Sequence, residues 1–153
     1  PMAGLLDRIH DELQERVDRA AMELVVDAPD ADILVAADTA GVGRILVNLV
    51  DNACKYAADA TDRRIHIAVT ATAGKVRVAV RDHGPGIGRK GERRLFKPFT
   101  KSDRDAAHSA AGVGLGLALS QRLAKRMGGR LSYDNTIDNG ACFVLELPRP
   151  GTS

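Results

Sequence analysis

The chain has 153 residues, which suits one domain that can bury a core without disulfides or metals to hold it together. It is 44% hydrophobic and 27% charged, a balance typical of a folded protein and not of a disordered one. There are 22 Lys and Arg against 20 Asp and Glu, so the net charge is only +2. This excludes the strongly basic surface of a general nucleic-acid binder, and we expect no nucleic-acid partner.

The longest apolar runs, such as residues 33–37, have five residues, so we expect no membrane segment in this chain. No secretory signal is visible, and Cys54 and Cys142 form neither a CxxC pair nor a metal-ligand pattern. We therefore expect two reduced core cysteines and a cytoplasmic location. A membrane-anchored parent protein is left open.

The first predicted element is an amphipathic helix over residues 2–20, in which Leu5, Ile9, Leu13 and Val17 recur every four residues. Its apolar stripe belongs either to the core of this domain or to a longer helix of which this is the tail.

Two β-like runs follow at 23–28 and 32–38, and then a helix for which Asp38 or Thr39 is the N-cap. The buried stripe of that helix is predicted to be Val42, Ile45, Leu46, Leu49 and Ala53.

Alternating Ile and Val residues predict a hairpin over residues 64–82. A helix is expected at about 115–127, with Leu115, Leu119, Leu123 and Met127 as its stripe. The runs RLSYDN and ACFVLELP read as a closing hairpin. The order βαββ…αββ predicts a single α/β domain.

Three polar side chains line one edge of the otherwise apolar helix after Asp38. Asn48, Asn52 and Lys55 are spaced at i, i+4 and i+7, which places them on the same face. Amide oxygens suit Mg²⁺, and an ammonium group suits a phosphate. The alternative is a polar rim that caps neighbouring backbone groups.

Two glycine-rich motifs follow. Asp82 ends an apolar strand, so its carboxylate is expected to be partly buried and to need a donor such as the amino group of adenine. Gly84 and Gly86 would let a flat ring approach the backbone, although a tight turn would use the same residues. The run GVGLG at 112–116 opens a helix, where backbone N–H groups either bind an anion or are simply capped.

The segment 88–111 between these motifs carries seven Lys or Arg and three acids, a net charge of 7 − 3 = +4. A solvated face would explain this excess. A basic lid that closes over a polyanion explains both the charge and its place between two phosphate-friendly motifs.

In order along the chain, NLVDNACKY, DHGPGI, LFKPF and GVGLGLAL resemble the N, G1, F and G2 boxes of sensor histidine kinases, the kinase branch of the GHKL ATP-binding superfamily. The resemblance covers about residues 23–148 and implies a two-layer α/β sandwich, with a mixed, mostly antiparallel sheet and helices on one face. It implies a catalytic ATP-binding domain at 23–150, preceded at 1–22 by a helix that could be the tail of an upstream linker or dimerisation helix.

By this resemblance, Asn48 and Asn52 approach Mg²⁺, Lys55 approaches the phosphates of ATP, and Asn48 and Lys55 are the catalytic candidates. Tyr56 borders the nucleotide, and Asp82 accepts the adenine amino group. The other implied nucleotide contacts are Gly84, Gly86, Ile87, Phe96, Phe99, Lys101, Gly112, Val113, Gly114, Leu115 and Gly116. Ala141 stands where many members carry Thr, so the resemblance does not extend to a hydroxyl or water bridge beside Asp82.

Relatives in the superfamily that hydrolyse ATP carry a glutamate base four residues before the metal-binding Asn. Here that position is Asn48, whose amide cannot accept a proton from water near neutral pH. This favours transfer of the γ-phosphoryl group to a histidine on a separate dimerisation domain, in cis in the parent protein, with a response regulator downstream. A GHKL-type ATPase and a non-catalytic nucleotide-sensing module are the alternatives.

The acceptor histidine is expected to lie outside this chain. His66, His83 and His108 fall in a strand, a turn and the basic segment, and none resembles an acceptor. His10, in IHDELQ, superficially resembles one, yet only 37 residues separate it from Asn48. That is too few for a second hairpin helix and the first strands of the domain.

Overall fold

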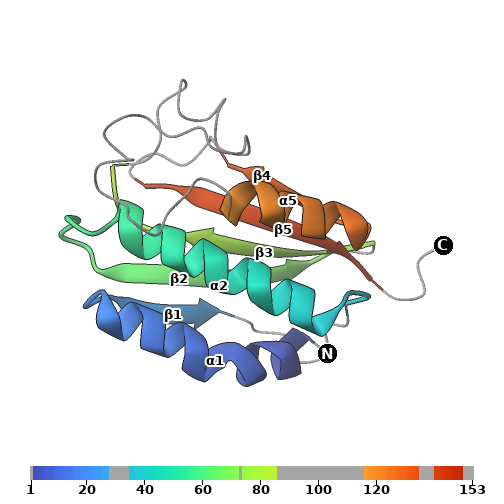
Figure 1. Ribbon diagram of the computed structural model, residues 1–153, viewed down its shortest axis with the longest axis horizontal. Helices are drawn as coiled ribbons and strands as arrows, with labels where there is room; N and C mark the ends of the chain where they lie inside the picture. The colour runs from blue at the N-terminus through green and yellow to red at the C-terminus, as the bar shows by residue number, and fades with distance from the viewer. Residues whose placement is uncertain (1, 28–34, 73, 86–115, 135–139, 150–153) are drawn as a thin grey trace.

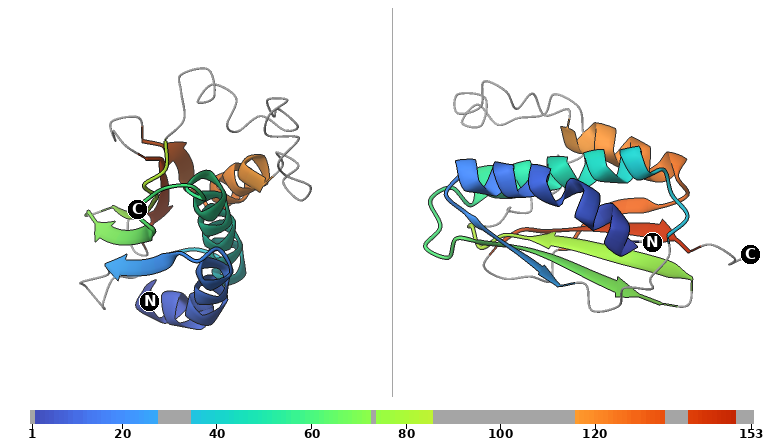
Figure 2. Two further views of the ribbon diagram at one scale, coloured as in Figure 1. Left: turned by 90° about the vertical axis from the view of Figure 1, so that its left-hand side faces the viewer. Right: turned by 90° about the horizontal axis from the view of Figure 1, so that it is seen from below.

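The computed structural model describes residues 2–27, 35–72, 74–85, 116–134 and 140–149. In chain order, its elements are α1 (Met2–Arg19), β1 (Glu23–Asp27), α2 (Thr39–Tyr56), β2 (Arg64–Ala71), β3 (Lys75–Arg81), α5 (Gly116–Arg126), β4 (Arg130–Tyr133) and β5 (Cys142–Pro148). They form two layers, in which the labelled helices all cover the same face of one sheet (Figure 1, Figure 2).

The sheet has the strand order β1-β2-β3-β5-β4. Only β1 and β2 run parallel, with Val25 opposite His66, while the other three pairs are antiparallel. In the centre, Val80 lies between Ile67 on β2 and Phe143 on β5. The expected two-layer sandwich, with a mixed and mostly antiparallel sheet, is confirmed.

The β2–β3 hairpin is confirmed, and its alternation matches the two faces of the sheet. The residues that point to the helices are all buried: Ile65, Ile67, Val69, Val76, Val78 and Val80. Since successive side chains of a strand point to opposite faces, this period-2 pattern determines which face can receive the helices. Burying each such side chain contributes about 1.5–3 kcal/mol.

Helix α2 is the central helix of the other layer. Its N-cap is Asp38, whose Oδ1 accepts a hydrogen bond of 3.3 Å from the N–H of Ala40. The predicted stripe of Val42, Ile45, Leu46, Leu49 and Ala53 is buried throughout. Burial of this face leaves the adjacent polar edge of the helix at the border of the core.

Helix α1 packs against α2 and β1. Its residues Met2, Leu5, Leu6, Leu13 and Val17 are buried, and Ile9 is half-buried. Arg16 forms an ion pair of 2.6 Å with Asp51 of α2. The apolar stripe of α1 therefore lies in the same core as the sheet. The described part of the chain contains no helix that is long and apolar enough to cross a membrane.

The stripe predicted for α5 is wrong at Leu119, which is 52% exposed. The buried residues of α5 are Leu117, Ala118, Ser120 and Ala124. A spacing of four residues drifts by about 40° per step around a helix of 3.6 residues per turn, so such a row leaves the buried face. Leu115 lies outside the described residues. The mostly small residues on the buried face let α5 come close to α2.

The second β-like run is not a strand where the structure describes it. Residues 35–38 have no strand assignment, although the N–H of Ala36 donates to the carbonyl of Pro148 over 2.9 Å. Residues 32–34 lie outside the described ranges.

Both cysteines are buried core residues, as expected. Burial, together with nearby Asp51, raises the pKa of Cys54 to about 11. Burial and Asp134 do the same for Cys142, to about 11. Thiols held neutral in this way are poor nucleophiles and poor metal ligands.

Candidate functional site

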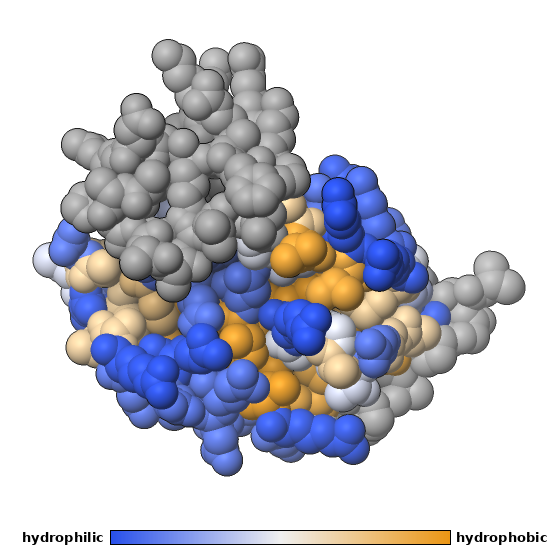
Figure 3. Space-filling model, in the orientation of Figure 1, coloured by the Kyte–Doolittle hydropathy of each residue, from blue (hydrophilic) through white to orange (hydrophobic). Residues whose placement is uncertain are grey.

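The polar edge predicted for α2 borders the core. Asn48 and Asn52 are half-buried, whereas Lys55 is exposed. In Figure 3, which views the helix side, apolar surface shows between the helices and is bordered by hydrophilic residues. Two amides and an ammonium group thus follow one line along α2, next to the buried apolar residues of the same helix.

Asn48 connects α2 to the start of α5. Its Nδ2 donates a hydrogen bond of 2.9 Å to Oγ of Ser120, which is itself buried. A Cβ atom on Gly116 would lie 2.5 Å from Oδ1 of Asn48, closer than real atoms approach. Gly116 therefore leaves the space that the Asn48 amide occupies beside the N-terminus of α5. Ser120 was not predicted, and its only signal in the sequence is its place four residues after Gly116.

This contact predicts an energetic coupling between two residues 68 positions apart (116 − 48). Gly116→Ala should push the Asn48 amide off Ser120 and lower the free energy of unfolding by about 1–2 kcal/mol. In an Asn48→Ala background, the same substitution should cost little, because the obstructing amide is gone. Urea denaturation of the four proteins measures the coupling. Additive costs would show that Gly116 is needed for another reason.

Asp82 closes the end of β3 against the start of β5. It is 2% exposed, and its Oδ1 accepts the N–H groups of Gly84 over 2.9 Å and Ala141 over 3.1 Å. The backbone N–H of Asp82 donates in turn to the carbonyl of Ala141 over 3.0 Å. Burial raises the pKa of Asp82, and the two N–H groups partly offset that effect. Both bonds with described residues end on Oδ1, which leaves Oδ2 for a further donor.

Two glycines allow the Asp82 turn to pack closely. A Cβ on Gly84 would lie 2.7 Å from the carbonyl oxygen of Tyr56, at the end of α2. A Cβ on Gly140 would lie 2.2 Å from the carbonyl oxygen of Asp82, and Gly140 has φ +140°. The missing side chain of Gly84 makes room for the backbone of Tyr56 and Ala57, and its expected role beside a flat ring stays a prediction.

His66 and His83 form a pair beside the turn. The sequence assigns no role to either histidine and indicates only that neither is a phosphoryl acceptor. Nε2 of His66 and Nε2 of His83 are 2.8 Å apart, and Oδ2 of Asp62 lies 3.6 Å from His83 Nε2. Burial, followed by the proximity of His83, lowers the pKa of His66. One Nε2 donates a hydrogen bond to the other, and this contact braces the turn from the β2 side. His10 is exposed on α1.

Helix α2 contacts both parts of the candidate site, the Asp82 turn and the start of α5. The start of α5 meets it at Asn48, and the Asp82 turn meets it at Tyr56 and Ala57. These two positions are about 12 Å apart along the helix axis, at 1.5 Å per residue. The remaining predicted contacts, Gly86, Ile87, Phe96, Phe99, Lys101, Gly112, Val113, Gly114 and Leu115, and the basic segment 88–111, lie outside the described residues.

Comparison with known proteins decides the family. A family profile described as histidine kinase-, DNA gyrase B-, and HSP90-like ATPase matches residues 37–151. The chain belongs to this family. The resemblance to a GHKL ATP-binding domain that was inferred from the sequence is thus confirmed.

Within this ATPase and kinase family, the chain is similar to sensor histidine kinases. It is 39% identical over 132 residues to the sensor histidine kinase MtrB of Mycobacterium tuberculosis, which is 86% of this chain and 23% of MtrB. The chain therefore spans less than a quarter of the length of that relative.

Two solved structures support the same placement in the family. Full-length ShkA in complex with AMPPNP matches with a TM-score of 0.80 and 26% identity, over 100% of this chain and 31% of that one. The catalytic domain of histidine kinase ThkA matches with a TM-score of 0.79 and 26% identity, over 97% and 94%. The fold is therefore that of a histidine-kinase catalytic domain.

Proposed function

We propose that the chain is the catalytic, ATP-binding domain of a sensor histidine kinase, which transfers the γ-phosphoryl group of ATP to a histidine on a separate dimerisation domain. The observation that carries the proposal is the position of two groups along α2. The buried carboxylate of Asp82 lies in the turn that contacts the C-terminal end of this helix, and the Asn48 amide lies about two turns earlier on the helix, beside the N-terminus of α5. This arrangement suits a ligand with an amino-substituted ring at one end and an anion at the other.

The ring end is Asp82. Its Oδ2 accepts the exocyclic amino group of adenine, while Oδ1 keeps the N–H groups of Gly84 and Ala141. Tyr56 on α2 borders the ring. Ala141 contributes through its backbone N–H, so the absence of a hydroxyl side chain at this position leaves the Asp82 contact intact.

The phosphate end of the site is formed by Asn48 and Asn52 on α2 and by the N-terminus of α5, where Gly116 lies against Asn48. The N-terminus of α5 favours an anion because its first N–H groups lack helical partners and the helix dipole is positive there. Lys55, exposed on the same edge, supplies a positive charge for the phosphate oxygens and for the charge that develops during transfer.

Magnesium fits this site as a companion of the nucleotide. The described residues contain no cluster of three His, Cys, Asp or Glu side chains that could hold a metal. The amides of Asn48 and Asn52 offer neutral oxygen ligands, and phosphate oxygens would supply the negative charge that Mg²⁺ requires. When bound, Mg²⁺ would neutralise charge on the phosphates.

The identity of residue 48 favours a kinase over an ATPase. The Asn48 amide cannot take a proton from water, and its Nδ2 already donates to Ser120. Phosphoryl transfer passes through a loose transition state, so positioning and charge neutralisation supply most of the catalysis. A group on the partner domain would accept the proton of the acceptor imidazole. A response regulator would then receive the phosphoryl group from the phosphohistidine.

Incubation with γ-labelled ATP tests the proposal. Alone, the chain should bind ATP, release little phosphate and place no label on His10. With the helical dimerisation domain of its parent protein, it should produce an acid-labile, base-stable phosphohistidine on that partner. A His10→Ala variant should behave identically. Brisk steady-state hydrolysis by the chain alone would indicate the ATPase alternative, and ATP binding without any transfer would indicate a sensing module.

A further inference from the structure

The strand β4 ends the sheet, and one of its sides has no strand partner among the described residues. The N–H of Asp134 donates to the carbonyl of Cys142 over 2.8 Å. Backbone groups alternate in direction along an antiparallel strand, so those of Ser132 also face β5, and those of Leu131 face away from it. The middle of β4 thus presents one N–H and one C=O in the geometry that an added strand would use.

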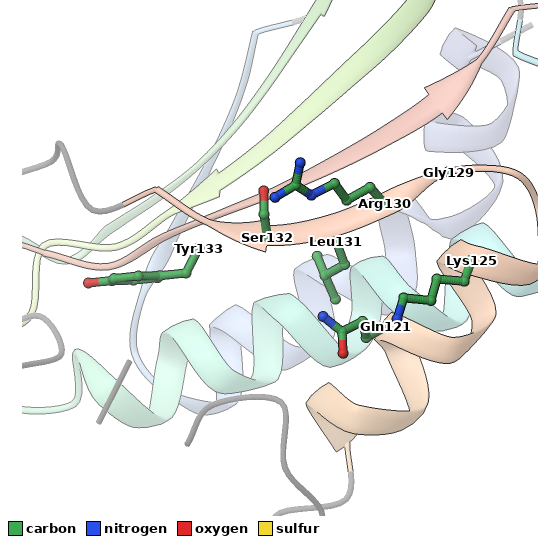
Figure 4. Close-up of a pocket in the computed structure, with 7 residues that line it drawn as sticks. All are labelled: Gln121, Lys125, Gly129, Arg130, Leu131, Ser132 and Tyr133. Atoms are coloured by element: carbon green, nitrogen blue, oxygen red, sulfur yellow. The ribbon is translucent and has the colours of Figure 1, made fainter. Parts of the chain in front are cut away.

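A hollow of about 580 Å³ lies against this edge. It is lined by Gln121, Lys125, Gly129, Arg130, Leu131, Ser132 and Tyr133. Figure 4 shows Gln121 and Lys125 side by side on α5 next to β4, while Arg130 and Ser132 lie on the other side of β4 from Leu131. A strand of four residues is about 13 Å long, so the hollow suits a short extended segment.

The surroundings of the hollow are basic. Lys125 and Arg130 line it, both are exposed, and no acidic residue lines it. Arg122 and Arg126, also exposed, lie on the same helix. None of these four cations forms an ion pair with a described residue. A segment that enters the hollow therefore meets uncompensated positive charge.

This charge distinguishes between possible occupants. Pairing of β4 with β4 of a second copy would bring Lys125 and Arg130 of both chains together, which is unfavourable. Charged residues on an edge strand also discourage indiscriminate pairing. Cations at this edge discriminate against basic segments but attract acidic ones.

We infer that the groove between α5 and β4 binds an extended acidic segment of a partner polypeptide, which adds to the sheet as a further strand beside β4. Main-chain hydrogen bonds at Leu131 supply affinity, and Lys125 and Arg130 select acidic side chains. The inference does not rest on nucleotide binding, because neither cation belongs to the proposed ATP site.

A fluorescein-labelled peptide of six alternating glutamate and valine residues is a suitable probe. Fluorescence anisotropy at low salt should show saturable binding to the whole chain. Lys125→Glu with Arg130→Glu should weaken binding by about tenfold or more and make the corresponding lysine–valine peptide the better ligand. Circular dichroism and ATP binding of the double variant should match those of the parent chain.

A second peptide tests strand addition on the unmodified protein. The same acidic sequence, N-methylated at every residue, keeps its charge but cannot donate along either edge, and it should bind about tenfold more weakly. Equal binding of both peptides would overturn strand addition in favour of a simple basic patch. Absence of saturable binding, or self-association of the chain that the charge reversal abolishes, would overturn the inference itself.

Discussion

Replacement of Asp82 by asparagine is expected to weaken ATP binding by about tenfold to a hundredfold and to leave the free energy of unfolding unchanged or higher. The amide oxygen can still accept from Gly84 and Ala141, so the turn is kept. The second oxygen becomes an NH₂ group, which cannot accept the adenine amino group. Calorimetric titration with ATP and urea denaturation measure the two effects separately.

The expected gain in stability follows from the pKa of Asp82. Burial raises that pKa above its ordinary value of 3.8, so the folded chain disfavours the ionised form relative to the unfolded chain. The stability that the protonated form provides is present below the unfolded pKa and is lost as the pH rises through the folded pKa. Asparagine removes this penalty at neutral pH, and its advantage should shrink as the pH falls.

Two controls make the Asp82 test specific. Asp82→Ala removes the acceptor for Gly84 and Ala141 as well, so it should lower both affinity and stability. GTP carries a carbonyl where ATP carries the amino group, so the unmodified chain should bind GTP poorly. If the Asp82→Asn variant binds ATP as tightly as the unmodified chain does, Asp82 does not bind the adenine amino group.

A second large effect is expected at Gly140, where alanine should lower the free energy of unfolding by about 2–4 kcal/mol. Gly140 has φ +140°, and an added Cβ would lie 2.2 Å from the backbone oxygen of Asp82, which cannot swing aside as a side-chain end could. Since Asp82 would shift with its turn, ATP affinity should fall as well. Urea denaturation gives the stability change.

Gly74→Ala is the matched control for Gly140→Ala. Gly74 lies in the β2–β3 turn, and a Cβ there would meet no heavy atom within 4 Å. The control should therefore change stability by no more than about 0.5 kcal/mol. Similar losses for both substitutions would mean that glycine matters in these turns for reasons other than the contact with Asp82.

The elements that could be predicted from the sequence are those with a local cause. The β2–β3 hairpin follows from alternation with a period of two, and the α2 stripe follows from a period of 3.6 with an Asp38 cap. The order of the motifs identified the family, because each motif is a contiguous run of residues. The placement of Asn48 and Asn52 at the border of the core also needed only the helical period.

The contacts within the site depended on how the chain packs over long separations. Asp82 is bonded to Ala141 from 59 residues away, and Asn48 to Ser120 from 72. No periodicity specifies such pairs, since they depend on how β3 registers with β5 and how closely α5 approaches α2. The same packing exposed Leu119 against expectation and placed Gly84 against the backbone of Tyr56 and Ala57. Hydrophobic pattern determines which face of an element is buried, but the steric fit between distant elements determines which polar groups meet there.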